Sequence, residues 1–171
     1  MVTSPRKKPA DPRAAHAAIT IPDICSQRCD NKSISLLPNV LGKQPARERG
    51  AFEAWQVDRG GMVCEGTSTN AWILTSGATV VTRQADSAIQ NGITRPAVLD
   101  IIGHEGYSCV GQPLSVAEAR SARGALLTST IVDLLPVVRI DDFAVGKGPP
   151  GPLSRKLCEY YLGHAASVRS A

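Results

Sequence analysis

The chain is poor in aromatic residues, at 4%, and none of its apolar runs approaches the roughly 20 residues of a membrane-spanning helix. Few aromatic side chains leave little for unpaired bases to stack on. The N-terminus contains Pro5, Pro9 and Pro12 and lacks the apolar core of a secretory signal. These absences predict a soluble cytoplasmic protein with neither a membrane nor a nucleic-acid partner.

Patterns of metal ligands are also missing. The five cysteines are scattered, and Cys25 and Cys29 have no second ligand pair at the spacing of a zinc site. None of the three histidines stands near these two cysteines. We therefore expect no metal site, and we expect thiols that stay reduced, as in a cytosolic protein.

What the sequence contains is typical of a globular domain. Its 171 residues are 43% hydrophobic and 20% charged, with a modest net charge of +4. That length suits one domain with a real hydrophobic core. Residues 18–164 are predicted to form this domain, after an irregular lead-in or connector at residues 1–17 and before a C-terminal tail at 165–171.

Short apolar runs divided by glycine-containing turns predict an α+β fold with a mostly antiparallel, curved sheet and flanking helices. The expected strands are 18–21, 52–57, 62–65, 71–75, 79–82, 108–113, 125–128 and 134–140. The expected helices are 34–49, 94–106, 115–123 and 153–164. Pro45 is expected to interrupt the first helix, and Thr94 is expected to be the N-cap of the second.

Four motifs could together serve one kind of chemistry. They are a lysine at 32, an acid followed by small polar residues at 65–70, and two Gly/Ser/Thr segments at 91–95 and 127–130. Pyridoxal 5′-phosphate (PLP) requires a lysine for its aldehyde, an acid for its ring nitrogen, and amides and hydroxyls for its phosphate. In this order the motifs predict a PLP site.

Each motif alone has a simpler interpretation. A lone lysine before a helix is usually exposed, and a glutamate at the end of a strand is usually solvated. The segment containing Gly92 and Thr94 alone indicates an ordinary capped helix, and Ser129 with Thr130 indicates a turn. The prediction therefore depends on the combination.

The motifs also resemble a known family. Residues 18 to 162 are similar to the cofactor-binding, C-terminal half of class IV (fold type IV) PLP-dependent aminotransferases, in the D-amino acid aminotransferase-like branch, whose large domain has a barrel-like core. The resemblance lies in residues 29–33 (Cys-Asp-Asn-Lys-Ser), 36–44, 65–70 (Glu-Gly-Thr-Ser-Thr-Asn), 92–95, 128–130, 136–141 and 148–152.

This resemblance implies a role for each matching residue. Lys32 would form the Schiff base and move the proton between the substrate Cα and the cofactor, and Glu65 would keep the ring nitrogen protonated. The other implied cofactor-binding residues are Ser68, Asn70, Gly92, Ile93, Thr94, Ser129 and Thr130. The implied reaction transfers an amino group between a D-amino acid, such as D-alanine, and a 2-oxo acid, in a homodimer.

Several departures from the family pattern leave alternatives open. Cys25 stands where the branch usually has arginine, Gln90 replaces a leucine that packs on the ring, and residues 1–17 are not expected to replace the family's smaller N-terminal domain. One alternative is a non-catalytic remnant of an aminotransferase gene. Aminodeoxychorismate lyase and branched-chain aminotransferase, from the same superfamily, are the others.

Overall fold

The computed structural model describes residues 14–25, 28–77 and 79–169. Its helices are α1 (Leu37–Glu48), α2 (Thr94–His104), α3 (Val116–Ser121) and α4 (Pro152–Arg169). Its strands are β1 (His16–Pro22), β2 (Glu53–Val57), β3 (Met62–Gly66), β4 (Asn70–Leu74), β5 (Val80–Thr82), β6 (Cys109–Gly111), β7 (Leu114–Ser115), β8 (Gly124–Ser129), β9 (Asp133–Ile140) and β10 (Phe143–Ala144).

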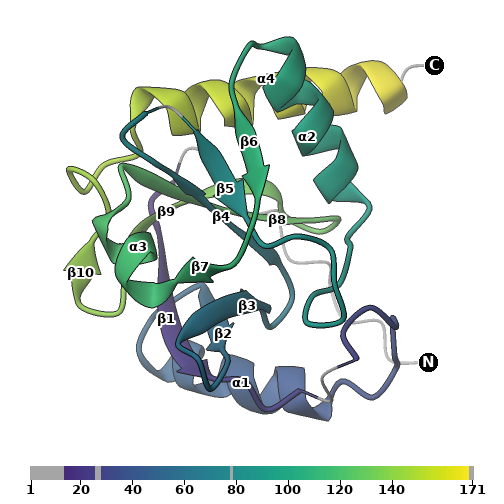
Figure 1. The fold of residues 1–171 in the computed structure, drawn as a ribbon, viewed down its shortest axis with the longest axis vertical. Coiled ribbons are helices and arrows are strands. Elements are labelled where there is room, and N and C mark those ends of the chain that lie inside the picture. The colour runs from purple at the N-terminus through teal and green to yellow at the C-terminus, as the bar shows by residue number, and fades with distance from the viewer. Residues whose placement is uncertain (1–13, 26–27, 78, 170–171) are drawn as a thin grey trace.

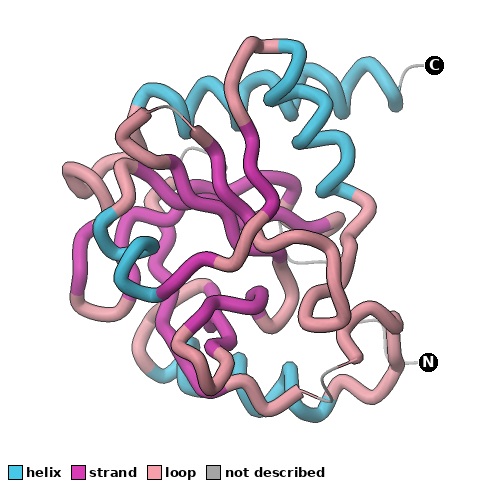
Figure 2. The backbone as a smooth tube through the Cα atoms, in the orientation of Figure 1, coloured by secondary structure: helices cyan, strands magenta, loops and turns pink. Residues whose placement is uncertain are grey.

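The strands form one curled sheet in the order β6-β5-β4-β8-β9-β1-β2-β3-β7, with β10 beside β9. Most neighbouring pairs are antiparallel, and β1 with β2, β1 with β9 and β5 with β6 are parallel. Figure 1 shows α1 below the β1–β3 part of the sheet and α2 and α4 above the other part. The helices in Figure 2 enclose the strands in the same way. The predicted α+β class with a mostly antiparallel, curved sheet is confirmed.

Three apolar clusters hold these layers together. The largest lies inside the curl of the sheet and includes Trp55 and Leu127. The second packs Trp72 and Leu126 against α2 and α4, and the third packs Ile19 of β1 and Ala54 of β2 against α1. Alternate side chains of a strand point to opposite faces, so neighbouring residues of β8 serve the first two clusters.

The first helix differs from its prediction at Pro45. The proline lies inside α1, and the helix continues through it to Glu48. The last turn is held by the Arg49 N–H, which donates to the Pro45 carbonyl, and by Ala46, which is fully buried against the sheet. A proline removes only its own N–H from the helix, and packing of Ala46 and Gly42 stabilises the rest.

The apolar residues that indicate this helix do not bury it. Ile34, Leu37, Val40 and Leu41 are all more than half exposed, while the small Gly42 and Ala46 make the contact with β1 and β2. Close approach requires a glycine at 42, because a Cβ there would lie 2.7 Å from the Ile21 Cδ1. The spacing predicts the helix correctly, but the buried face consists of small residues.

The start of α2 also differs. Ile93 is the N-cap and Thr94 is the first helical residue, with no side-chain cap hydrogen bond. The Arg95 N–H donates to the Gly92 carbonyl, so the chain already turns before Thr94. The predicted N-cap at Thr94 is therefore wrong by one residue.

The chain ends fall partly outside the described residues. Of the predicted lead-in, residues 1–13 lie outside them, and residues 16 and 17 belong to β1. Helix α4 continues to Arg169, beyond the end predicted at 164, while residues 170 and 171 lie outside the description. In the part of the chain that is described, no helix is long and apolar enough to span a bilayer.

Candidate functional site

A cavity of about 960 Å³ opens between the β1–α1 segment and the ends of several strands. Its walls come from the loop before α1 together with one side of α1, the end of β3 with the turn after it, the loop before α2, and the end of β8 with the residues after it. Every residue predicted for the site borders this one cavity: Lys32, Glu65, Ser68, Asn70, Gly92, Ile93, Thr94, Ser129 and Thr130. Residues nearly 100 positions apart in the chain thus share one space.

The sheet register brings two of these walls together. Asn70 at the start of β4 pairs with Thr128 at the end of β8, so the turn after Glu65 and the segment after Thr128 lie at the same edge. The Asn70 side-chain amide then donates to the Gln90 carbonyl at 2.8 Å, which fixes the loop before α2 against that edge. A backbone pairing and a single buried amide therefore position three of the four walls.

Glu65 is a buried acid with few compensating groups. Its side chain accepts a hydrogen bond from the Gln90 N–H at 2.7 Å and a longer one of 3.4 Å from the Asn70 amide. Burial raises its pKa from the ordinary 4.5 to about 7, although bonds from the Gln90 N–H and the Cys29 thiol oppose the rise. A carboxyl group with a pKa near neutrality can exchange a proton with a bound group at physiological pH.

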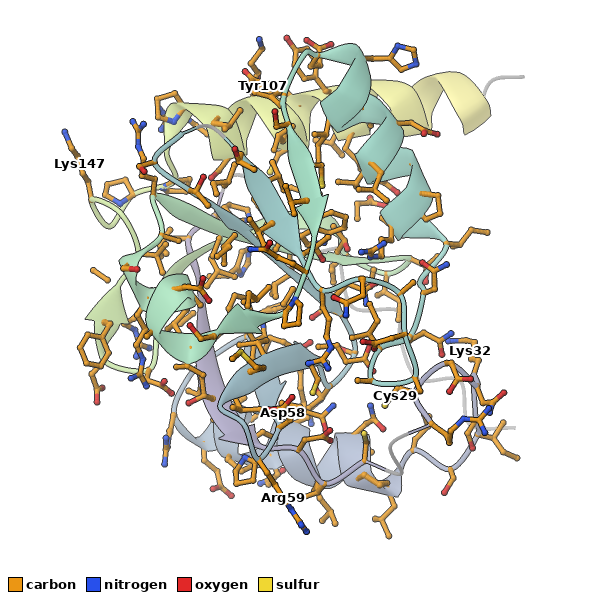
Figure 3. The ribbon with its side chains drawn as sticks, in the orientation of Figure 1. Cys29, Lys32, Asp58, Arg59, Tyr107 and Lys147 are labelled. Carbon is orange, nitrogen blue, oxygen red and sulfur yellow. The ribbon has the colours of Figure 1, made fainter. Side chains whose placement is uncertain are left out.

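Lys32 borders the cavity as an exposed residue. It lies in the irregular stretch between β1 and α1, before the helix begins. Figure 3 shows Lys32 and Cys29 close to each other on this stretch, on the side of the molecule opposite Lys147. The amine can therefore reach the cavity from its rim.

Two further walls of the cavity, at the start of α2 and at the end of β8, offer backbone amides and hydroxyls. Ile93 and the buried Thr94 are at the beginning of α2, where free N–H groups and the helix dipole favour an anion. Ser129 ends β8 and Thr130 follows it, on the neighbouring wall. The Ser129 hydroxyl also accepts a bond from the Ile131 N–H, which holds this turn in shape.

Two predicted residues have side chains that bind the protein itself. The Ser68 hydroxyl donates to Glu53 at 2.9 Å, and the Asn70 amide donates to Gln90 and Glu65. Both border the cavity, yet these contacts indicate that they shape the walls.

Glu53 is a residue that the sequence reasoning missed. It is fully buried on β2 and accepts hydrogen bonds from the Lys43 amine at 2.7 Å, the Ala54 N–H, and the hydroxyls of Thr67, Ser68 and Thr69. This carboxylate therefore holds the turn after Glu65 against α1. The only signal for it in the sequence is weak, an acid at the start of a mostly apolar strand.

Two cysteines at the cavity form a pair that the sequence does not predict. The sulfurs of Cys25 and Cys29 are 2.9 Å apart, and both residues border the cavity. Their spacing indicates only an incomplete zinc site, and no group of three or more metal-ligating side chains is found among the residues described.

Sequence comparison connects this cavity to a family. The profile of a family described as amino-transferase class IV matches residues 1–140. A D-alanine aminotransferase from Bacillus licheniformis is 37% identical over 91% of this chain and 54% of its own length. One from Staphylococcus haemolyticus is 39% identical over 90% of this chain and 54% of its own. The chain thus spans about half the length of these relatives.

Solved structures show the same fold. A T.th. branched-chain amino acid aminotransferase, solved with pyridoxamine 5′-phosphate, matches with a TM-score of 0.79 at 28% identity, over 88% of this chain and 51% of that one. A branched-chain amino acid aminotransferase from Thermobaculum terrenum matches with a TM-score of 0.81 at 23% identity, over 88% and 50%. The second likeness concerns the fold alone.

Proposed function

The chain belongs to the class IV aminotransferase family, and we propose that it supplies the PLP-binding part of a transaminase acting on a D-amino acid, such as D-alanine, and a 2-oxo acid. One observation carries the proposal. An amine, a buried acid and two segments rich in amides and hydroxyls border a single cavity, although they come from four separate parts of the chain.

The acid suits the ring of the proposed cofactor. Ionised Glu65 is costly to bury because only a few hydrogen bonds compensate its charge. A protonated pyridine nitrogen beside it would supply the missing positive partner, and the carboxylate would in turn keep that proton on the ring. The neutral partners of Glu65 and its raised pKa therefore favour a site built for a cationic ring.

The walls of the cavity at α2 and β8 suit a phosphate. Backbone amides at Ile93 and Thr94 and hydroxyls at Ser129 and Thr130 are the groups that bind such an anion at a helix N-terminus. Gly92 permits the close approach of this loop, because a Cβ there would lie 2.9 Å from the Asn70 Oδ1.

Lys32 would hold the cofactor at the cavity rim and carry a proton. When bound, PLP supplies an aldehyde for the amino group and a ring that withdraws electrons from the substrate Cα. The Lys32 Nζ would accept the Cα proton from one side of the substrate and return a proton to the cofactor carbon. Its position outside any helix or strand leaves the amine free to make this short movement.

The choice of a D-amino acid rests on the curated relatives. The D-alanine aminotransferases are 37% and 39% identical to this chain, whereas the solved branched-chain enzyme is 28% identical. Parallel assays of D-alanine and L-leucine with 2-oxoglutarate test this choice, and turnover of the L-amino acid alone would favour the branched-chain alternative. A homodimer and a cytoplasmic location remain predictions.

Trapping of the cofactor tests the proposed site. The chain is mixed with PLP and reduced with borohydride, and the pyridoxyl group is located by peptide mass spectrometry. We expect one group per chain on Lys32. Lys43 is the matched control, because it borders the same cavity but is paired with Glu53. Equal labelling of both lysines, or labelling that persists unchanged in K32A, would support the non-catalytic alternative.

A further inference from the structure

Two thiols at the edge of the cavity have no part in the proposed transamination. Cys25 and Cys29 are both reduced in this structure, and their sulfurs are 2.9 Å apart. A disulfide bond requires about 2.05 Å between the sulfurs, so they need to approach by less than about 1 Å.

The backbone holds both cysteines in position. The Cys25 N–H donates to the Asp23 carboxylate at 2.8 Å, and the Cys29 N–H donates to the Ser87 carbonyl at 2.9 Å. Asp23 directly follows β1, while Ser87 belongs to the loop between β5 and α2. The pair is therefore anchored at both ends to the sheet side of the cavity.

We propose that Cys25 and Cys29 are a modification site, at which a small-molecule disulfide of the glutathione type oxidises them to an intramolecular disulfide. One protein thiolate attacks the small disulfide and releases one thiol. The second protein thiolate then attacks the mixed disulfide, forms the Cys25–Cys29 bond and releases a second thiol. The protein loses two electrons and two protons, and the small disulfide gains them.

The surroundings of Cys29 determine how this site behaves. Burial, with a hydrogen bond to Cys25, raises the pKa of the Cys29 thiol well above its ordinary value. Because the thiolate is the attacking species, exchange at neutral pH is slow and becomes faster as the pH rises. The site therefore responds to the equilibrium redox balance, and short exposure to an oxidant leaves it reduced.

Oxidation would reach the proposed cofactor site through two routes. Cys29 stands three residues before Lys32, so a new link to Cys25 restrains the segment that carries the amine. The Cys29 thiol also hydrogen-bonds Glu65 and lowers its pKa. A disulfide has no S–H to donate, so oxidation raises the pKa of Glu65 further. This consequence rests on the proposed function, whereas formation of the disulfide does not.

Peptide mapping tests the proposal directly. The full chain is equilibrated at pH 8 in glutathione buffers of increasing oxidised fraction, trapped with N-ethylmaleimide, and digested with trypsin without reduction. Trypsin cleaves after Arg28, between the two cysteines, so only a disulfide keeps the peptide ending at Arg28 joined to the one beginning at Cys29. We expect this joined species to accumulate as both thiols lose their alkylation together.

Variants separate the proposal from other outcomes. C25S and C29S should each abolish the joined species, and C109S, which alters a cysteine on β6, should leave it unchanged. Alkylation of both cysteines at the most oxidising ratio, separate glutathione adducts, or a bond to Cys64 would overturn the proposal. PLP trapping on Lys32 is then compared in the reduced and oxidised protein. A disulfide that forms without PLP trapping in either state would refute only the proposed function.

Discussion

Glu53 and Glu65 are both buried carboxylic acids, on the adjacent strands β2 and β3, but their surroundings are opposite. Glu53 is surrounded by donors: an ammonium, a backbone N–H and three hydroxyls. Among the described residues, Glu65 has only neutral donors, and burial raises its pKa to about 7. Glu53 therefore holds the cavity wall in place, whereas the Glu65 carboxylate has no cationic partner among the described residues and could bind a cationic group.

Removal of Glu53 should produce the largest loss of stability. E53A leaves the Lys43 ammonium without its partner beside a fully buried position, so we expect the unfolding free energy to fall by about 3–5 kcal/mol. Urea denaturation measures this change. The control is E48A on α1, whose exposed side chain accepts a bond from Gln44 and should matter by less than about 0.5 kcal/mol. Equal effects would remove the structural role assigned to Glu53.

Glu65 should instead make stability depend on pH. Its folded-state pKa is about 7 against an ordinary 4.5, so between these values the folded protein binds more protons than the unfolded one. The unfolding free energy therefore falls as the pH rises through this window, by about 3 kcal/mol in total.

The variant E65Q isolates this effect from the other acids. Carboxyl groups with lowered pKa, such as Asp58 and Asp141, add stability as the pH rises, so the difference between wild type and E65Q is the informative quantity. In thermal melts from pH 4 to pH 8, the melting temperature of E65Q should rise relative to that of the wild type as the pH increases. A constant difference would contradict the raised pKa.

The position of Gly66, which follows Glu65 and faces Glu53, should tolerate no larger side chain without a loss of stability. A Cβ at Gly66 would meet the Thr69 hydroxyl and lie 2.9 Å from the Glu53 Cγ, so G66A should cost about 1–3 kcal/mol. Gly103 in α2 has nothing within 4 Å of such a Cβ, and G103A should stabilise the protein by about 0.5–1 kcal/mol. Denaturation midpoints of the two variants should therefore move in opposite directions.

The sequence predicts the strands around the cavity and the residues Lys32 and Glu65, but it does not predict the role of Glu53. Apolar alternation and glycine turns predict the strands from β2 to β5, because each forms with a neighbour close in sequence. Lys32 and Glu65 stand out because their neighbouring residues match a motif. Glu53 lacks such a motif, and its partners come from α1 and from the turn at 67–69, so only the tertiary structure reveals them.

The errors at α1 and α2 have the same origin. Local preferences predict a break at Pro45 and a cap at Thr94. In the structure, packing of Ala46 keeps α1 helical beyond Pro45, and the turn at Gly92 moves the N-cap of α2 to Ile93. The pairing of Cys25 with Cys29 escapes prediction for a related reason. Cysteine spacing alone can be compared only with metal-site patterns, whereas the proximity of these two depends on a local bond from the Cys25 N–H to Asp23 and a tertiary bond from the Cys29 N–H to Ser87.

Among the predicted losses of stability, that at Asn70 should be the smallest. Its buried amide joins the Gln90 loop to the Glu65 wall, so N70A leaves the Gln90 carbonyl without this donor and should cost about 1–2 kcal/mol. N91A, at an exposed position on the same loop, should change stability by less than about 0.5 kcal/mol. Comparable midpoints for the two variants would mean that the amide does not hold the loop.

Binding of PLP to E65Q tests the central claim, which is that the Glu65 carboxylate pairs with the protonated ring nitrogen of PLP. Fluorescence titration at pH 7.5 gives the dissociation constant for wild type and variant. We predict that E65Q binds PLP about 10–100-fold more weakly, a loss of about 1.4–2.8 kcal/mol, while its unfolding free energy does not fall. Unchanged PLP affinity in a folded E65Q protein would contradict the account.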